Sequence, residues 1–412
     1  MLLIVCLVVI SYEVLSLQGY TSTSPRLHRD NQVLDDADLA PLNLERNAVR
    51  RPSIAHSDRS ATTLRKRAHT APPSTTDAVQ SRTTMIMIAN FRDTARCAET
   101  LHSLFTNAVH PEFLRVSIFD QIYLHQGELQ CIDAYCRNVG EVDCRRNQVV
   151  HSMIHADQAT GPTRARYETE KAVADEDFCM TIDSHLVFIQ GWDAELHGQW
   201  DSIGNANAII TVYPKSTELM HTDNSGLVQL MCHARIETND PDTMIQYGSP
   251  IWIPAPAKPR LMSQFAGGFN FGNCLQAKTI RNDPYTPYLF HGEEYSRAAR
   301  LWTSGYDFYA PRKDVVYHWY EPRHVMWETD WTARHAMQQA SKRRVRATLG
   351  LPYVADDFDH TDLDKFQLGT KRTFAQWLAF TGIDPYAPYQ GTDVKQFDNC
   401  RELELIPYDK ME

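Results

Sequence analysis

Residues 178–185 read FCMTIDSH, and this stretch decides the fold. The run from Phe178 to Ile182 is nearly all apolar, which predicts a strand buried in a parallel sheet. Such a strand places Asp183 and His185 at its carboxyl end. Because ligands of open α/β sheets bind outside the carboxyl ends of the strands, this placement indicates a functional site.

The pattern D-x-H joins a carboxylate and an imidazole two positions apart. In an extended segment, this spacing puts Asp183 and His185 on one side, where both can bind one divalent cation. A cation at this position can neutralise a diphosphate and assist its departure. For so short a pattern, a solvated turn is the alternative.

His318 is the candidate third ligand, because the apolar VVY at 315–317 predicts that it ends a buried strand. A histidine packed among aromatic side chains is the alternative for this position. His324 and His233 are competing ligands that the sequence does not exclude.

The segments upstream predict an α/β sheet. Residues 85–89 read MIMIA and are followed by the polar NFRD at 90–93, as expected for a buried strand that ends in a loop. A predicted helix over 94–109 and a strand over 114–119 complete a βαβ unit, which is typical of nucleotide-binding sheets. Further strands are expected at 149–154, 208–213 and 315–319, and helices at 163–174, 293–302, 329–349 and 373–380.

Composition limits the class of protein. The chain has 412 residues, of which 43% are hydrophobic, enough for one large or two medium domains. The formal net charge of -10 argues against a general nucleic-acid binder, so no nucleic-acid partner is expected. The nine cysteines contain no paired C-x-x-C arrangement of the kind that holds structural zinc. A few disulfides are expected if the chain is secretory, but their pairing cannot be read.

The N-terminus begins with an unbroken apolar run from Leu2 to Ile10. With Glu13 close behind, the run is short for a membrane span of roughly 20 apolar residues, and no basic residues precede it. We expect 1–18 to be a signal anchor or a signal peptide, with a misannotated start or a buried terminal strand as alternatives. Residues 19–82 are polar with weak apolar periodicity, which predicts a flexible stem.

Two further segments place charged groups at predicted helix starts. Arg164 and Arg166 follow the Gly-Pro at 161–162, where they suit a phosphate or a nucleotide edge, or are simply solvated. Glu293 and Glu294 begin another helix. Paired carboxylates there suit a hydroxyl group or a base, or merely favour the helix start.

Taken together, these segments resemble the polypeptide N-acetylglucosaminyltransferase family, which adds GlcNAc to hydroxyl groups of proteins. They resemble the polypeptide N-acetylgalactosaminyltransferases more distantly. The similarity covers roughly Thr84 to Asp384. Its motifs lie at 86–93, 161–166, 182–193, 266–269, 290–307 and 368–384. Each motif is modest, but their order and spacing together are specific.

The resemblance implies a GT-A fold, an α/β architecture in which a Rossmann-like nucleotide-binding sheet is joined to an acceptor-binding half. It also implies UDP-GlcNAc as donor, a Mn²⁺-type ion and retention of the anomeric configuration. The catalytic domain would span 83–330, and 331–412 would form a C-terminal helical extension packed on it.

Carried over position by position, the resemblance implies a role for each matching residue. The implied metal ligands are Asp183, His185 and His318. The implied donor-binding residues are Arg92, Asp93, Arg164, Arg166, Gly267, Gly268 and Trp302. Among these, the two glycines would let the backbone approach the sugar, and the tryptophan would be acceptor-side or structural. Glu293 or Glu294 would face the sugar as the catalytic carboxylate.

Two features depart from these families. The best-known GlcNAc members act on cytoplasmic protein, whereas the apolar start of this chain predicts a single-pass type II protein of the Golgi or ER membrane. Its catalytic domain would be lumenal, its acceptor a protein or glycoprotein, and its membrane contact confined to the N-terminal segment; a secreted enzyme is the alternative. The tail after Tyr353 is too short for the lectin domain of the GalNAc group.

Two other activities stay open. The first is a related transferase that uses another UDP-sugar, with GalNAc or glucose. The second is an inactive member that binds a nucleotide sugar or a glycoprotein.

Overall fold

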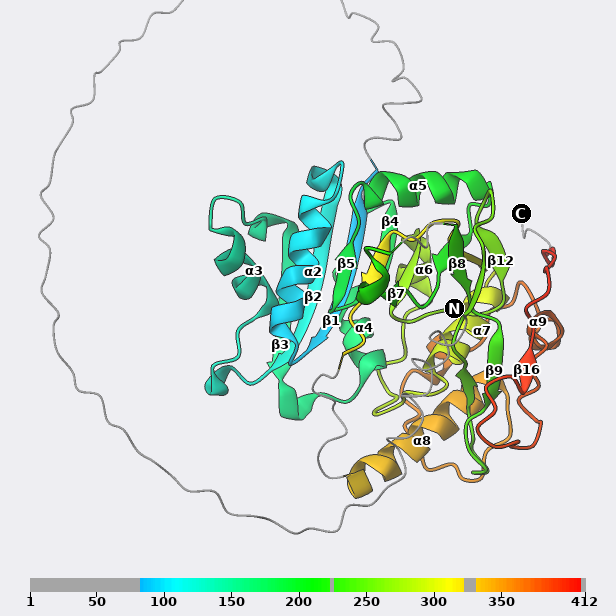
Figure 1. Cartoon of the computed structure of the whole chain (residues 1–412). Coiled ribbons are helices and arrows are strands. Elements are labelled where there is room, and N and C mark those ends of the chain that lie inside the picture. Colours follow the sequence, from blue (N-terminus) through cyan, green and yellow to red (C-terminus); the bar gives the residue numbers. More distant parts are fainter. Residues whose placement is uncertain (1–81, 223–225, 322–330, 409–412) are drawn as a thin grey trace, which may run out of the picture. The chain divides into compact units, whose positions relative to one another are not determined.

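The structure is a computed structural model that describes residues 82–222, 226–321 and 331–408 (Figure 1). The predicted signal segment and all of the predicted stem except Arg82 lie outside these ranges. None of the helices in them is long and apolar enough to cross a membrane.

An eight-stranded sheet forms the centre of the fold (Figure 1). Its strands, in spatial order, are β12 (Arg260–Met262), β14 (Asp307–Ala310), β6 (Ala208–Thr211), β13 (Phe269–Asn273), β4 (Phe178–Asp183), β1 (Thr84–Phe91), β2 (Leu114–Ile122) and β3 (Val149–His155). β1 pairs in parallel with both β2 and β4, and β2 pairs in parallel with β3. β13 runs antiparallel to its neighbours β4 and β6. β6 therefore runs in the same direction as β4, and β14 is parallel to β6, so the carboxyl ends of six strands share one edge.

Strand β1 is buried on both faces because its apolar residues run without alternation. Ile86 and Ile88 point to the main core, which includes residues of α2 (Thr94–Thr106). Met85 and Met87 point to the opposite face and pack in a second cluster with Cys274. The central sheet thus has a packed layer on each side, which explains why the sequence of this strand is hydrophobic throughout.

Helices pack on the sheet or on one another. They are α2, α3 (Cys131–Val139), α4 (Pro162–Glu170), α5 (Trp192–Ile203), α6 (Leu275–Thr279), α7 (Glu293–Thr303), α8 (Trp331–Leu349) and α9 (Phe374–Thr381). α2 packs against α3, and α4 packs against β1 and β2. The helix predicted over 163–174 is shorter in the structure, because 171–173 continue from α4 as a tighter turn with bonds from residue i+3 to residue i.

Three small sheets complete the fold. They are β10 (Ile245–Tyr247), β9 (His233–Ile236) and β16 (Phe397–Asp398); β11 (Ile251–Pro254) and β8 (Leu227–Leu230); and β5 (Leu186–Phe188), β15 (Val316–His318) and β7 (Lys215–Ser216). The last of these sheets holds the strand that the sequence predicted over 315–319.

All eight cysteines of the described residues are paired, which the sequence could not assign. The disulfides are Cys97–Cys131, Cys136–Cys144, Cys179–Cys274 and Cys232–Cys400. The first links α2 to the start of α3, and the third links β4 to the segment before α6. The third therefore fixes the strand that carries D-x-H.

The C-terminal segment packs on the rest of the fold. Ser341 Oγ in α8 donates to Pro287 O at 2.7 Å. Trp377 in α9 is fully buried, with its ring 5.5 Å from that of Trp302. All the described residues belong to one compact unit. The predicted α/β fold is confirmed, with a large parallel-dominated sheet whose carboxyl edge holds D-x-H.

Candidate active site

The carboxyl end of β4 and the end of β15 bring the three predicted metal ligands together. β15 pairs antiparallel with β5, so His318 lies opposite Leu186, the residue after His185. Ligand atoms of Asp183, His185 and His318 all lie within 4.8 Å of one another. His318 Nε2 is 3.6 Å from Asp183 Oδ2. One carboxylate and two imidazoles form a donor set that suits a divalent first-row metal ion.

His185 is held in a fixed orientation with one nitrogen left over. Its Nδ1 lies 3.1 Å from Asp93 Oδ2, and Arg96 Nε donates to Asp93 Oδ1 at 2.8 Å. Burial alone would raise the pKa of Asp93, but its contacts with His185 and Arg96 outweigh burial and lower that pKa. The Nε2 atom of His185 is buried and has no hydrogen-bond partner among the described residues. A carboxylate behind a ligating histidine is a common way to orient a metal ligand.

Arg166 connects Asp183 to Glu293. Its Nη2 donates to Asp183 Oδ1 at 3.2 Å, and its Nη1 donates to Glu293 Oε1 at 2.6 Å. Burial alone would raise the pKa of Asp183, but the contacts with His318 and Arg166 lower it well below its usual range. The carboxylate of Asp183 is therefore ionised at neutral pH, as a metal ligand must be.

Gly267 and Gly268 lie directly against these charged groups. A Cβ atom at Gly267 would lie 2.6 Å from Arg166 Nη1, and one at Gly268 would lie 2.5 Å from Asp183 Oδ2. The backbone N–H of Asp183 donates to Gly268 O at 3.0 Å. Because the two glycines have no side chains, Arg166 and Asp183 have room to lie beside them.

The two adjacent glutamates at the start of α7 have different surroundings. Glu294 Oε1 accepts from the backbone N–H of Gly267 at 2.7 Å, and its Oε2 accepts from the Tyr213 hydroxyl. Burial and the neighbouring Glu293 raise the pKa of Glu294 to about 7. Glu293 Oε2, in contrast, is buried without a partner among the described residues. Only Glu293 therefore has a carboxylate oxygen left for a ligand.

Three predicted donor-binding residues do not join this cluster. Arg92 turns to Glu128, with its Nε and Nη2 at 2.9 and 2.8 Å from Oε1. Arg164 lies two positions before Arg166 on α4, so it points about 200° away around the helix. Trp302 is fully buried, with its ring 5.2 Å from that of Phe380, which is the position of a structural residue.

Of the two competing histidines, the structure describes only His233. His324 lies outside the described residues. His233 lies beside Cys232 and Cys400, which form a disulfide and so offer no thiolate.

Sequence reasoning missed two residues. Arg96 holds Asp93, and its spacing of three residues on α2 was a usable signal. Tyr213 holds Glu294, which is 81 positions away, so no local pattern could indicate the contact.

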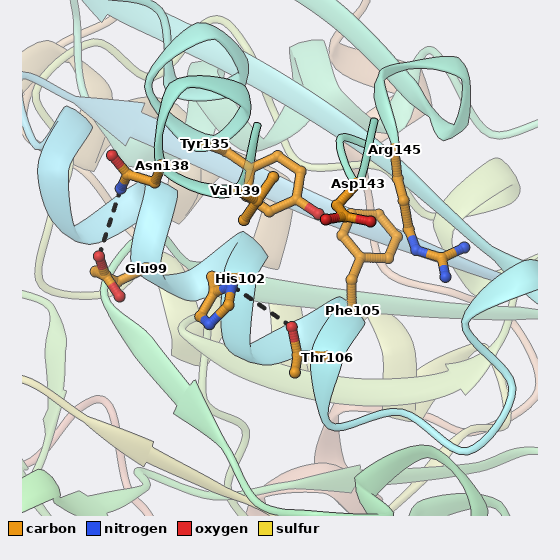
Figure 2. A pocket seen from close by; sticks show the side chains of 9 residues that line it. All are labelled: Glu99, His102, Phe105, Thr106, Tyr135, Asn138, Val139, Asp143 and Arg145. Atoms are coloured by element: carbon orange, nitrogen blue, oxygen red, sulfur yellow. Dashed lines mark hydrogen bonds between the residues drawn. The ribbon is translucent and has the colours of Figure 1, made fainter. Parts of the chain in front are cut away.

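A pocket of about 530 Å³ lies over α2 and α3, and none of the predicted site residues lines it (Figure 2). Its lining comprises Glu99, His102, Phe105, Thr106, Tyr135, Asn138, Val139, Asp143 and Arg145. A neighbouring hollow of about 410 Å³ includes Arg96 and Trp319 in its lining and so lies closer to the cluster. The larger pocket is therefore not the candidate active site.

Residues 129–387, well over half of the chain, match the family model Glycosyltransferase (GlcNAc). The chain belongs to this family. The match contains Asp183, His185 and His318, and it leaves out the first resembling motif, at 86–93. The resemblance is thus confirmed at the level of this glycosyltransferase family. No curated protein sequence matches the chain.

Among solved structures, this chain is similar to GalNAc-T7 with UDP, GalNAc and Mn²⁺, at 13% identity and a TM-score of 0.47. That alignment covers 72% of this chain and only 56% of GalNAc-T7, so this chain spans a little over half of its length. It is also similar to Staphylococcus aureus TarS 1-349 in complex with UDP-GlcNAc, at 13% identity and a TM-score of 0.41. That alignment covers 72% of this chain and 71% of TarS 1-349.

Proposed function

We propose that this glycosyltransferase moves GlcNAc from UDP-GlcNAc to a hydroxyl group of a protein, on Ser, Thr or hydroxyproline, with retention of configuration. One observation carries the proposal: Asp183, His185 and His318 converge at the carboxyl edge of the sheet, and His185 Nε2 is buried without a partner among the described residues. Family membership supports GlcNAc as the transferred sugar.

The cluster fits a divalent metal ion, with Mn²⁺ as the proposed ion. Asp183, His185 and His318 would hold it, and when bound it would stabilise the negative charge of the UDP leaving group. Asp93 keeps the His185 ring in place. Gly268 keeps space free beside Asp183, since a side chain there would collide with the carboxylate.

Glu293 and Glu294 have different roles at the donor sugar. Glu293 Oε2 is free to accept a hydrogen bond from a sugar hydroxyl. Glu294 is a positioning residue, because both its oxygens are engaged by Gly267 and Tyr213. Asp183 and Glu293 are both engaged by Arg166, which makes either a poor nucleophile and favours front-face attack by the acceptor hydroxyl.

We also propose that the catalytic part folds in the lumen of the secretory pathway, as a type II Golgi or ER protein. The four disulfides support this, because such bonds form and persist in oxidising compartments. The proposed membrane attachment through residues 1–18 concerns a segment outside the described residues.

The test is UDP release by the purified full-length chain with a panel of UDP-sugars, in Mn²⁺ and then in EDTA. Metal-dependent turnover confined to UDP-GlcNAc is the expected result. Turnover of UDP-GalNAc or UDP-glucose instead would show that the proposed donor is wrong, while the proposed class of enzyme would stand. A folded chain that binds UDP-sugars without turnover would be an inactive binding member, and the proposed activity would be wrong.

A further inference from the structure

Three buried arginines lie together near the middle of α7. Arg297 and Arg300, one turn apart on the helix, are 5% and 3% exposed, and Arg344 of α8 is fully buried. Arg297 Nη2 donates to Glu170 Oε1 at 3.0 Å. Arg344 pairs with Asp283 through Nε at 2.8 Å and Nη2 at 3.1 Å. Three guanidinium groups thus lie beside two buried carboxylates, so one guanidinium has no carboxylate partner among these contacts.

The guanidinium without such a partner is that of Arg300. Its Nε is buried without a hydrogen-bond partner within the ranges that the structure describes, and its guanidinium lies 5.2 Å from the ring of Phe366. Burial and the neighbouring Arg297 lower the pKa of Arg300 to about 9. An uncompensated buried charge is among the most costly features a fold can carry.

Several hydrogen-bond donors around this charge also lack acceptors. The buried atoms without a partner in the described part of the chain are Arg297 Nε, Arg297 Nη1, Arg300 Nε and Gln276 Nε2. They belong to one place, because Arg297 and Arg300 are one helical turn apart and Gln276 Oε1 lies 3.5 Å from Arg297 Nη2. A group of unpaired donors beside an excess positive charge is the chemistry of an anion site.

We propose that this group of residues binds one small monovalent anion, chloride, inside the fold. A single negative charge balances the one excess guanidinium, and a halide can accept several N–H donors at once. Arg297 and Arg300 supply the charge, and Gln276 supplies an amide donor. The proposed anion site begins one helical turn after Glu293 on α7, and Arg166 of the candidate active site pairs with Asp183 and Glu293 instead.

The first test is the melting temperature of the full-length chain in sodium chloride and in sodium gluconate at equal ionic strength. Chloride should raise it by roughly a few degrees and in a saturable way, because a ligand that binds only the folded state stabilises it. Arg300→Met should abolish the chloride-dependent rise. Arg372→Met is the matched control, because Arg372 is also buried but pairs with Asp307, so the rise should persist.

The second test does not depend on whether these variants fold. A crystal of the wild-type chain grown in sodium bromide should show an anomalous peak within hydrogen-bond distance of both Arg297 and Arg300. Water density without an anomalous peak, or a melting temperature equal in the two salts, would overturn the proposal.

Discussion

Glu293 and Glu294 are adjacent in the sequence, yet their carboxylates have different hydrogen-bond partners in the fold. The carboxylate of Glu294 is satisfied by protein groups, whereas Glu293 keeps one oxygen unpaired. From the sequence the two were interchangeable candidates, because a helix start offers both residues to the same edge. Only the tertiary contacts of Gly267 and Tyr213 separate the positioning residue from the one that can reach a ligand.

The raised pKa of Glu294 makes stability depend on pH. Between its ordinary pKa of 4.5 and the folded value of about 7, the folded state keeps a proton that the unfolded state has released. This contribution to stability is complete below 4.5 and is lost as pH rises through about 7. Relative to Glu294→Gln, the wild-type chain should therefore lose up to about 3 kcal/mol of unfolding free energy between pH 4.5 and pH 8.

Urea unfolding of both chains in EDTA at several pH values measures this difference. Glu99→Gln, at an exposed position on α2, is the control and should follow the wild type at every pH. A constant difference between wild type and Glu294→Gln across the range would show that Glu294 titrates normally.

Gly268 is expected to tolerate no side chain. In Gly268→Ala the new methyl group would displace the Asp183 carboxylate, because its Cβ would lie 2.5 Å from Oδ2. The rate of UDP release should fall at least about 10–100-fold, the usual cost of disturbing a metal ligand. Gly198→Ala in α5 is the control, since nothing lies within 4 Å of its Cβ and activity should be kept. Wild-type turnover in Gly268→Ala would refute the contact.

The site residues that sequence predicted best are those fixed by a local element. Asp183 and His185 follow from an apolar strand whose end must face the ligand edge. Tyr213 escaped prediction because its role is a contact to a distant segment, whereas the three-residue spacing of Arg96 from Asp93 was a local signal. Trp302 was placed among the donor-binding residues with an acceptor-side or structural role, and its burial against Phe380 favours the structural role.

At the scale of elements, the strands and helices follow from apolar patterning, whereas their pairing does not. The prediction that the strands at 85–89 and 114–119 belong to one βαβ unit holds, and the two strands pair in parallel, because such a unit allows few other arrangements. β15 meets β5 and β7 through contacts that no local pattern encodes. Apolar patterning made His318 a candidate third ligand, but it could not exclude His324 and His233.

A disulfide that closes a longer loop should stabilise the fold more than one that closes a shorter loop. Cys179–Cys274 spans 95 positions and Cys136–Cys144 only 8. Replacing both cysteines by Ala should cost about 4 kcal/mol for the long loop and about 2 kcal/mol for the short one, since closing a longer loop removes more entropy from the unfolded chain. Chemical unfolding under non-reducing conditions measures both. An equal or larger cost for the short loop would contradict this order.

At the scale of the whole molecule, the candidate site is assembled from distant segments. β4 supplies Asp183, β15 supplies His318, and α7 supplies Glu293. Apolar patterning predicted the sheet and the edge at which these groups meet. It could not predict their distances, because side-chain contacts between segments leave no periodic signal in one sequence.

The central claim is that Asp183, His185 and His318 form a metal site. The most direct measurement is calorimetric titration of Mn²⁺ into the full-length chain with UDP present. We predict one site in the wild type and affinity at least about 10–100-fold weaker in His185→Gln, with His102→Gln binding like the wild type. Equal Mn²⁺ affinity in the wild type and His185→Gln would contradict the account.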